Sequence, residues 1–156
     1  MNEVNEIIKS TLEELIGKMG FDVSIEIESA TDEEGGSVCN ITTKEDSSFL
    51  IGQYGANLQA IQHIARLLVR KRTSEKTKFV VDINSYRKEK NNSVIEIAKE
   101  AAAQAISEKR AVIMKPMSNY ERRIVHMELS KNDSVTTESI GEGDGRKIII
   151  KPVELI

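Results

Sequence analysis

Two glycines three residues apart, Gly52 and Gly55, constrain the fold of this chain more than any other feature. An apolar segment, Phe49–Ile51, precedes them, and an amphipathic helical pattern ending in a cluster of cations follows. Glycine lets the backbone turn tightly and approach another molecule closely, because it lacks a Cβ atom. Amides that open onto a helix N-terminus suit a phosphate group. The pattern therefore predicts a helix–loop–helix whose loop, Gly52-Gln53-Tyr54-Gly55, can approach a phosphate backbone.

Apolar periodicity predicts a complete α+β unit around this loop. The expected elements are a helix over residues 2–19, strands over 21–29 and 38–44, a short helix capped by Asp46-Ser47-Ser48, a helix from Gly55 to about Arg72, and a strand over 78–84. The acidic triplet Asp32-Glu33-Glu34 is expected in a solvated hairpin turn, and Cys39 in the core. A three-stranded sheet backed by three helices is a self-sufficient packing unit.

The remaining residues predict a long helix and a second small unit. The helix is expected over residues 85–109, with one apolar side formed by Val94, Ile97, Ala98, Ala101, Ala102, Ala105 and Ile106. Strands are expected over 111–117, 134–138 and 146–153, with a helix from Asn119 to Ser130 between the first two. We therefore expect a domain at 1–84, a connecting helix at 85–109 and a second domain at 110–156.

Charge is distributed unevenly along the chain, although the formal net charge is only −3. Residues 1–46 hold 3 Lys/Arg against 12 Asp/Glu, a net of −9, whereas residues 47–156 hold 19 against 13, a net of +6. Such asymmetry says more about partners than the total does. The basic portion begins just before the glycine loop, so it favours an anionic partner there.

Composition narrows the class of protein further. Aromatic residues make up 4% of the chain and Trp is absent, which argues against binding many bases on aromatic platforms. One cysteine forms no internal disulfide, and no leader or membrane-spanning run is visible, which indicates a cytoplasmic protein. Two histidines 63 residues apart, without a cysteine cluster, predict no metal site, and no cofactor motif occurs.

Two clusters carry the expected chemistry. In the first, the amides of Gln53 and Tyr54 would contact phosphate, with Ile51, Leu58 and Ile61 lining an apolar groove and with cations at Arg66, Arg70, Lys71 and Arg72. In the second, Arg122 and His126 lie four apart and share a helix face, with Arg123 and Arg146 extending it. An isolated R-x-x-x-H pattern is also typical of a structural histidine, and no nucleophile or general-base pair indicates an enzyme.

Three segments together resemble the bacterial Jag (SpoIIIJ-associated) family: LIGQYGANLQAIQHI, DINSYRKEK, and MSNYERRIVHMEL followed by TESIGEGDGRKIIIKP. The resemblance implies a type II KH domain, ordered helix-strand-strand-helix-helix-strand, joined to an R-x-x-x-H domain. It also implies cytoplasmic binding of single-stranded RNA, or single-stranded DNA, and a role in cell elongation and division. Many members carry a basic residue in the glycine loop, unlike this chain, and many carry a further N-terminal domain that is not matched here.

The resemblance leaves a second hypothesis open. Some members pair with a small single-KH protein, and the −9 segment would repel RNA. A protein-interaction module that binds such a partner, or a second copy of itself, is therefore the alternative to RNA binding.

Overall fold

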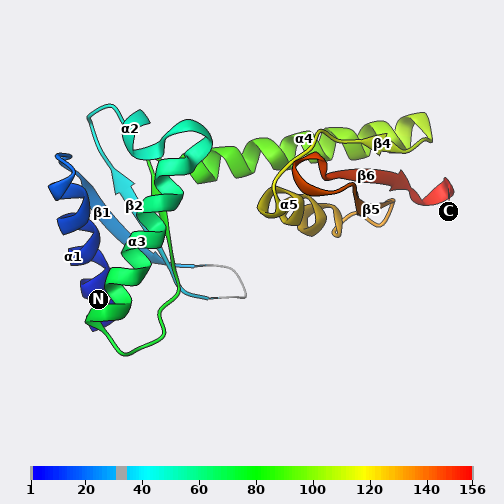
Figure 1. Cartoon of the computed structure of the whole chain (residues 1–156). Helices are drawn as coiled ribbons and strands as arrows, with labels where there is room; N and C mark the ends of the chain where they lie inside the picture. Colours follow the sequence, from blue (N-terminus) through cyan, green and yellow to red (C-terminus); the bar gives the residue numbers. More distant parts are fainter. Residues whose placement is uncertain (1, 31–34, 156) are drawn as a thin grey trace. The chain divides into compact units, whose positions relative to one another are not determined.

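The computed structural model describes residues 2–30 and 35–155, which form two compact units, Met1–Arg87 and Lys88–Ile156 (Figure 1). Each unit combines helices with a three-stranded sheet, so the expected α+β class is confirmed. The acidic triplet Asp32-Glu33-Glu34 lies outside the described residues. Within the described ranges, no helix is both long and apolar enough to cross a membrane.

The first unit has the predicted order of elements. They are α1 (Glu3–Lys18), β1 (Ser24–Ser29), β2 (Ser37–Thr42), α2 (Ser48–Ile51), the short 3-10 turn η1 (Gln53–Gly55), α3 (Ala56–Arg72) and β3 (Phe79–Ile83). Asn2 caps α1, because its side chain accepts a hydrogen bond from the Asn5 amide at 2.8 Å. Asp46 accepts from the Ser48 amide at 2.9 Å and thereby starts α2.

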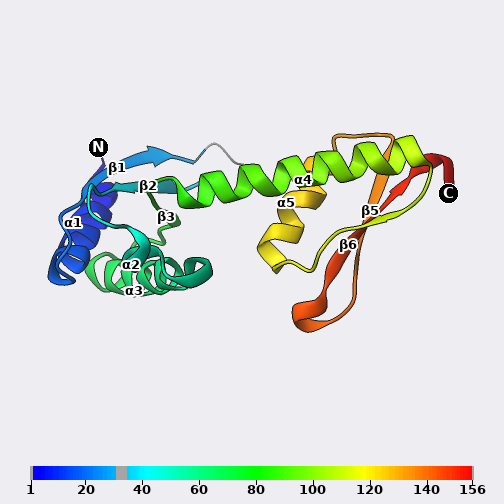
Figure 2. The ribbon, with the colours of Figure 1, turned by 90° about the horizontal axis from the view of Figure 1, so that it is seen from above.

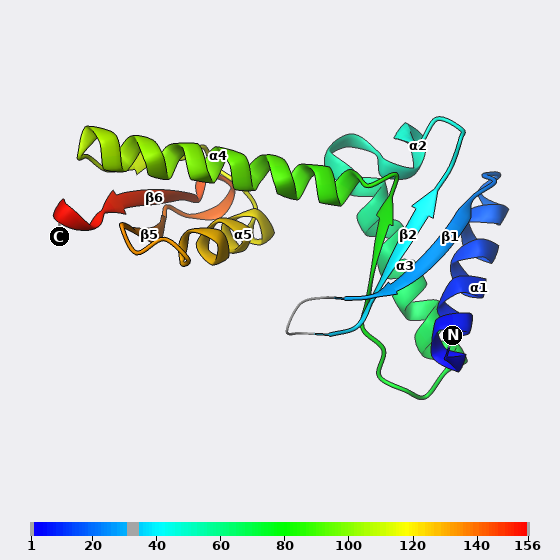
Figure 3. The same cartoon turned by 180° about the vertical axis from the view of Figure 1, so that it is seen from behind.

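The sheet of the first unit runs β1-β2-β3, with β1 antiparallel and β3 parallel to the central β2. Its register aligns Ile27, Cys39 and Val81 across the three strands. These residues face α1 and α3, which cover one side of the sheet (Figures 1 and 3). Cys39 is fully buried as expected, and burial raises the pKa of its thiol to about 12.

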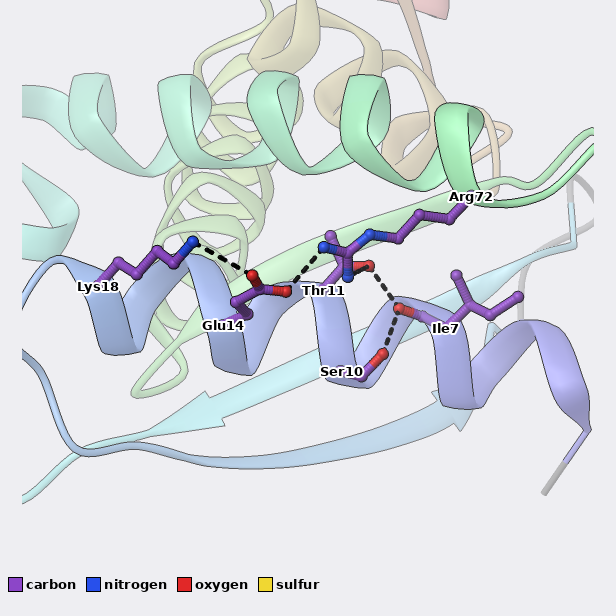
Figure 4. A network of polar contacts seen from close by, with 6 residues as sticks. All are labelled: Ile7, Ser10, Thr11, Glu14, Lys18 and Arg72. Carbon is purple, nitrogen blue, oxygen red and sulfur yellow. Dashed lines mark hydrogen bonds and ion pairs between the residues drawn. The ribbon is translucent and has the colours of Figure 1, made fainter.

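Polar contacts join the C-terminal end of α3 to α1 (Figure 4). The Arg72 guanidinium donates to Thr11 Oγ1 at 3.1 Å and to Glu14 Oε2 at 2.7 Å. The hydrogen bond from Arg72, together with that from Lys18, lowers the pKa of Glu14. Arg72 therefore contributes to helix packing within the first unit.

The second unit is built around α4 (Tyr86–Glu108), whose first two residues belong to the first unit. It continues with β4 (Val112–Ile113), α5 (Asn119–Leu129), β5 (Val135–Ile140), the turn η2 (Gly143–Gly145), β6 (Lys147–Pro152) and η3 (Val153–Leu155). The antiparallel sheet runs β4-β6-β5. Alanines of α4 pack with Val125 of α5 and Ile148 of β6 in the core (Figure 2).

The strand expected over residues 111–117 is mostly wrong, since only Val112–Ile113 pair as a strand. Pro116 has no amide hydrogen, and a proline cannot donate to a sheet ladder. The segment still follows β6 through two separate bonds, from the Met114 amide to Ile148 O at 2.9 Å and from the Met117 amide to Arg146 O at 3.2 Å.

Three isoleucines expected on buried helix faces are instead exposed: Ile64 by 44%, Ile97 by 56% and Ile106 by 40%. The buried stripe of each helix is narrower than its apolar pattern. On α4 the core is reached through Ala98, Ala102 and Ala105, and Ile97 is rotated about 100° from Ala98. Sequence periodicity overestimated the width of these contacts.

Candidate nucleic-acid interface

The glycine loop has a backbone conformation that its sequence type requires. Gly52 has φ +73° and ψ 178°, and Gly55 has φ +78°, both in regions that side chains disfavour. A Cβ atom on Gly52 would lie 2.6 Å from Asn57 Cγ, and one on Gly55 would lie 3.1 Å from Tyr86 Cε1. Neither position can carry a side chain without moving its neighbour.

Two residues outside the predicted site support the loop. Asn57 Nδ2 donates to the Phe49 carbonyl at 2.8 Å and ties α3 back to α2. The ring of Tyr86, at the start of α4, lies against Gly55. Asparagine one turn into a helix that follows glycine was a usable signal for the first contact. Nothing in the sequence indicated the second, which joins residues 31 positions apart.

The surface of the loop differs from the predicted apolar groove. Gln53 is exposed and Tyr54 is 82% exposed, so both variable positions face outward. Ile51 is half-buried. Leu58 and Ile61 are only 1% and 4% exposed and belong to the core, so their expected contact with bases is wrong for this conformation.

Side chains cover the outer edge of β3. Gln62 Oε1 accepts from the Val81 amide and from Arg87 Nη2, both at 3.1 Å. Arg87 Nε donates to Val81 O at 2.9 Å, and Arg66 Nη2 donates to Phe79 O at 3.2 Å. An open strand edge would offer unpaired backbone groups. Here polar side chains from α3 and α4 satisfy them.

The cations of α3 are spread along the helix. Arg70 and Lys71 are exposed, but they lie 14 and 15 residues after Ala56. At about 1.5 Å per residue, that places them roughly 21 Å along the axis from the glycine loop. With Arg72 paired to Glu14 and Arg66 bonded to β3, none of these four cations directly reinforces the loop.

The second cluster lies on α5, whose start is set by a capping box. Ser118 Oγ accepts from the Glu121 amide at 3.2 Å, and Glu121 Oε2 accepts from the Ser118 amide at 2.9 Å. This fixes the first turn of α5. The helix then presents Arg122 and His126 on one face, as the four-residue spacing predicted.

Arg122 is largely committed to structure. It is 8% exposed, its Nη1 donates to Met117 O at 2.6 Å, and its Nη2 donates to Asn119 Oδ1. The guanidinium therefore closes the bend between β4 and α5. Its charge nevertheless lies at the wall of a surface hollow.

His126 is held from both ring nitrogens by hydroxyls of β5. Nδ1 lies 2.7 Å from Thr137 Oγ1 and Nε2 lies 2.9 Å from Ser139 Oγ. Burial, and secondarily the positive charge of Arg122, lower the pKa of His126. The ring is consequently neutral at pH 7. Alternation along β5 puts Thr137 and Ser139 on one face, but sequence alone did not pair that face with α5.

The Arg/His hollow, as we call it, brings the four predicted residues of this unit together. It measures about 430 Å³ and is lined by Asn119, Arg122, Arg123, His126, Met127, Ser139 and Arg146. Arg123 is exposed, and Arg146 Nη1 donates to Gly141 O at 3.3 Å from the turn before β6. Three guanidinium groups around an open hollow can bind a phosphate or the acceptor edge of a base.

The rival catalytic arrangement gains no support from the neighbouring acid. Glu128 forms ion pairs with Lys99 at 3.5 Å and Lys131 at 3.2 Å, and the hydrogen bond from Lys131 lowers its pKa. His63, the other histidine, is an exposed residue of α3. Within residues 2–30 and 35–155, no three His, Cys, Asp or Glu side chains gather to hold a metal ion.

Comparison with known proteins assigns the second unit. Residues 92–152 match the family model of the R-x-x-x-H domain, a span that includes the Arg/His hollow. The proteins named RNA-binding protein KhpB are similar to this chain along most of its length. That of Clostridium symbiosum is 33% identical over 141 residues, which cover 89% of this chain and 62% of that protein. This chain belongs to the Jag family.

Other relatives of this Jag-family chain are more distant or longer. RNA-binding protein KhpB of Bacillus subtilis is 30% identical over 110 residues, which cover 69% of this chain and 53% of that protein. For the protein of the same name in Lactiplantibacillus plantarum, the identity is 29% over 109 residues, which cover 70% and 33%. The chain thus matches between a third and three fifths of these relatives' lengths.

Proposed function

We propose that this Jag-family chain is a non-enzymatic protein that binds single-stranded RNA through two surfaces. The Arg/His hollow carries the proposal, because it gathers three guanidinium groups around a neutral histidine within the span matched by the R-x-x-x-H domain family. An anion is the natural occupant of such a hollow. Relatives at 29–33% identity carry the name RNA-binding protein, which favours a nucleic-acid phosphate over a free anion.

The first unit would be a type II KH domain and supply the second surface. Its accessory helix and strand come first, β2 and β3 are parallel, and the Gly-Gln-Tyr-Gly loop joins α2 to α3. In this reading the loop clamps about four nucleotides, with the Gln53 and Tyr54 amides facing phosphate. Residues 1–84, 85–109 and 110–156 would then be the KH domain, the connecting helix and the R-x-x-x-H domain. A cytoplasmic role in cell elongation and division belongs to the same proposal.

Binding of a short single-stranded RNA, followed by fluorescence anisotropy at several salt concentrations, tests the proposal. The wild-type protein should bind the strand more tightly than a duplex of the same sequence. Arg123→Ala with Arg146→Ala should weaken binding and reduce the slope of log affinity against log salt by about 1.4, since each contact to a single strand contributes about 0.7. These two positions are preferred to Arg122, whose loss would also disturb folding.

The matched control removes two cations of the same unit outside the hollow. Arg110 and Lys151 are paired with Glu108 and Glu138 and do not line the hollow. Arg110→Ala with Lys151→Ala should leave the slope nearly unchanged. A wild-type protein that binds no single strand at low salt would refute the proposed function, and equal losses in the two double variants would refute the hollow as the contact.

Protein interaction is the second candidate, and one observation favours it. Ile64 and Leu67 are 44% and 46% exposed on the outer side of α3, where an apolar contact would bury them. A small KH protein or a second copy of the chain would be the partner. Light scattering and pull-down after nuclease digestion decide, because only a protein contact survives removal of RNA.

A further inference from the structure

Two aromatic side chains of the first unit are unusually exposed, and both belong to the glycine-loop region. Phe49 on α2 is 69% exposed and Tyr54 in the loop is 82% exposed. The other aromatic residues of this unit face its core: Phe79 is 2% exposed, and Phe21 and Tyr86 pack against it half-buried. In a chain with three Phe, three Tyr and no Trp, this placement is selective.

Core packing does not explain the Phe49 side chain. In the four-residue helix α2 the anchor is its neighbour Leu50, which is fully buried. Phe49 points to the other side, where a polar residue would serve solubility better. The Phe49 carbonyl is fixed by Asn57, whose side chain also lies against Gly52, so the ring is attached to a well-supported backbone next to the loop.

The Tyr54 backbone supplies an independent observation. Tyr54 has φ 55° and ψ 26°, a left-handed conformation that is uncommon for a bulky residue. Residues held in such conformations cluster at binding sites, where the surrounding structure maintains them. Here η1 and α3 hold the position, and the result is a ring presented to solvent beside two glycines.

We propose that Phe49 and Tyr54 are stacking surfaces for bases of the single strand that the glycine loop holds. This inference rests on the proposed function of the loop. The loop has no Lys or Arg at either variable position, and the cations of α3 lie far along the helix or are paired. Aromatic rings stack on every kind of base, so they supply affinity that does not depend on charge or sequence.

Substitutions at Phe49 separate stacking from simple apolar contact. Phe49→Ala should weaken binding of a single-stranded RNA about tenfold or more, whereas Phe49→Trp should preserve or improve it. Phe49→Leu keeps apolar bulk without a π-face and should behave like Phe49→Ala. The salt slope should stay at the wild-type value in all three variants, because stacking releases no counterions.

Tyr54 is tested with its backbone preserved. Tyr54→Asn keeps a residue that tolerates the left-handed region but removes the ring, and it should weaken binding about tenfold. Tyr54→Phe should bind like the wild type. Leu67→Ala removes a comparable exposed apolar side chain from α3, away from the loop, and should leave RNA binding unchanged.

The outcomes distinguish this inference from the proposed function. If the wild type binds and Phe49→Ala and Tyr54→Asn bind equally well, stacking is refuted while RNA binding stands. If Phe49→Leu matches the wild type and Phe49→Ala does not, the contact is apolar and stacking at Phe49 is refuted. Loss of a protein complex on Phe49→Ala, with unchanged RNA binding, would also overturn the inference.

Discussion

Arg122 and His126 lie four residues apart on one face of α5, yet their side chains are engaged differently. Arg122 is buried against Met117 O and Asn119, whereas His126 lies between two hydroxyls of β5. The exposed cation of the hollow is Arg123, with Arg146 half-buried opposite. The residues that give the motif its pattern therefore shape the hollow as much as they charge it.

The lowered pKa of His126 predicts a pH-dependent stability. Above the ordinary pKa of about 6.5, the ring is neutral in the folded and unfolded chain alike. Below it, the unfolded histidine takes up a proton first, so the free energy of unfolding falls as the pH falls through the lowered folded pKa. Urea unfolding at pH 7.5 and pH 5.0 should show a smaller loss in His126→Gln than in the wild type. His63→Gln, at an exposed position, should lose as much as the wild type; an equal loss in all three proteins would contradict the assignment.

At this scale the sequence predicted which residues share a face, but not what holds them. The spacing of Arg122 and His126 is a local property of a helix. Their partners Met117, Thr137 and Ser139 depend on how α5 packs on β5 and on the turn before it. Burial of Leu58 and Ile61 likewise follows from the tertiary core, which periodicity locates only to within a side of the helix.

At the scale of elements, the α2–loop–α3 segment depends on its two glycines. Gly52→Ala should lower the free energy of unfolding of the first unit by about 1–3 kcal/mol, because only glycine favours its backbone angles. It would also displace Asn57 from the Phe49 carbonyl. Gly55→Ala should cost about 1–2 kcal/mol for its left-handed φ.

Gly17→Ala is the matched control, because Gly17 lies within α1 with nothing within 4 Å of an added Cβ. It should be neutral or stabilising by up to about 1 kcal/mol. Labelling of Cys39 measures all three, since its buried, protonated thiol reacts only when the first core opens. Labelling that is no faster in Gly52→Ala than in Gly17→Ala would show that the loop geometry is not required.

Element order was predictable because each helix and strand has a strong local pattern. The α1, α3, α4 and α5 helices and the β1, β2 and β3 strands begin and end within a few residues of their predicted limits. The strand before α5 failed because Pro116 interrupts its pairing. Pairing is a property of two strands, and the pattern of one strand does not contain it.

At the scale of the whole chain, two units each have their own hydrophobic core. The net charge of −3 conceals a −9 segment at 1–46 and a +6 remainder. Helix α1 and strand β1 lie within the acidic segment, and the glycine loop and the Arg/His hollow both lie in the basic one. The charge pattern along the chain was therefore a better guide to the candidate sites than the total.

Single-stranded RNA binding by the glycine loop is the central claim, and charge reversal there tests it most directly. Gln53→Asp with Tyr54→Asp places two carboxylates on exposed positions of the loop, at residue types that tolerate its backbone. Asn2→Asp with Ser10→Asp adds the same charge to exposed positions of α1. In anisotropy titrations at low salt, the loop variant should lose binding and the α1 variant should retain it. Unchanged binding by the loop variant would contradict the account.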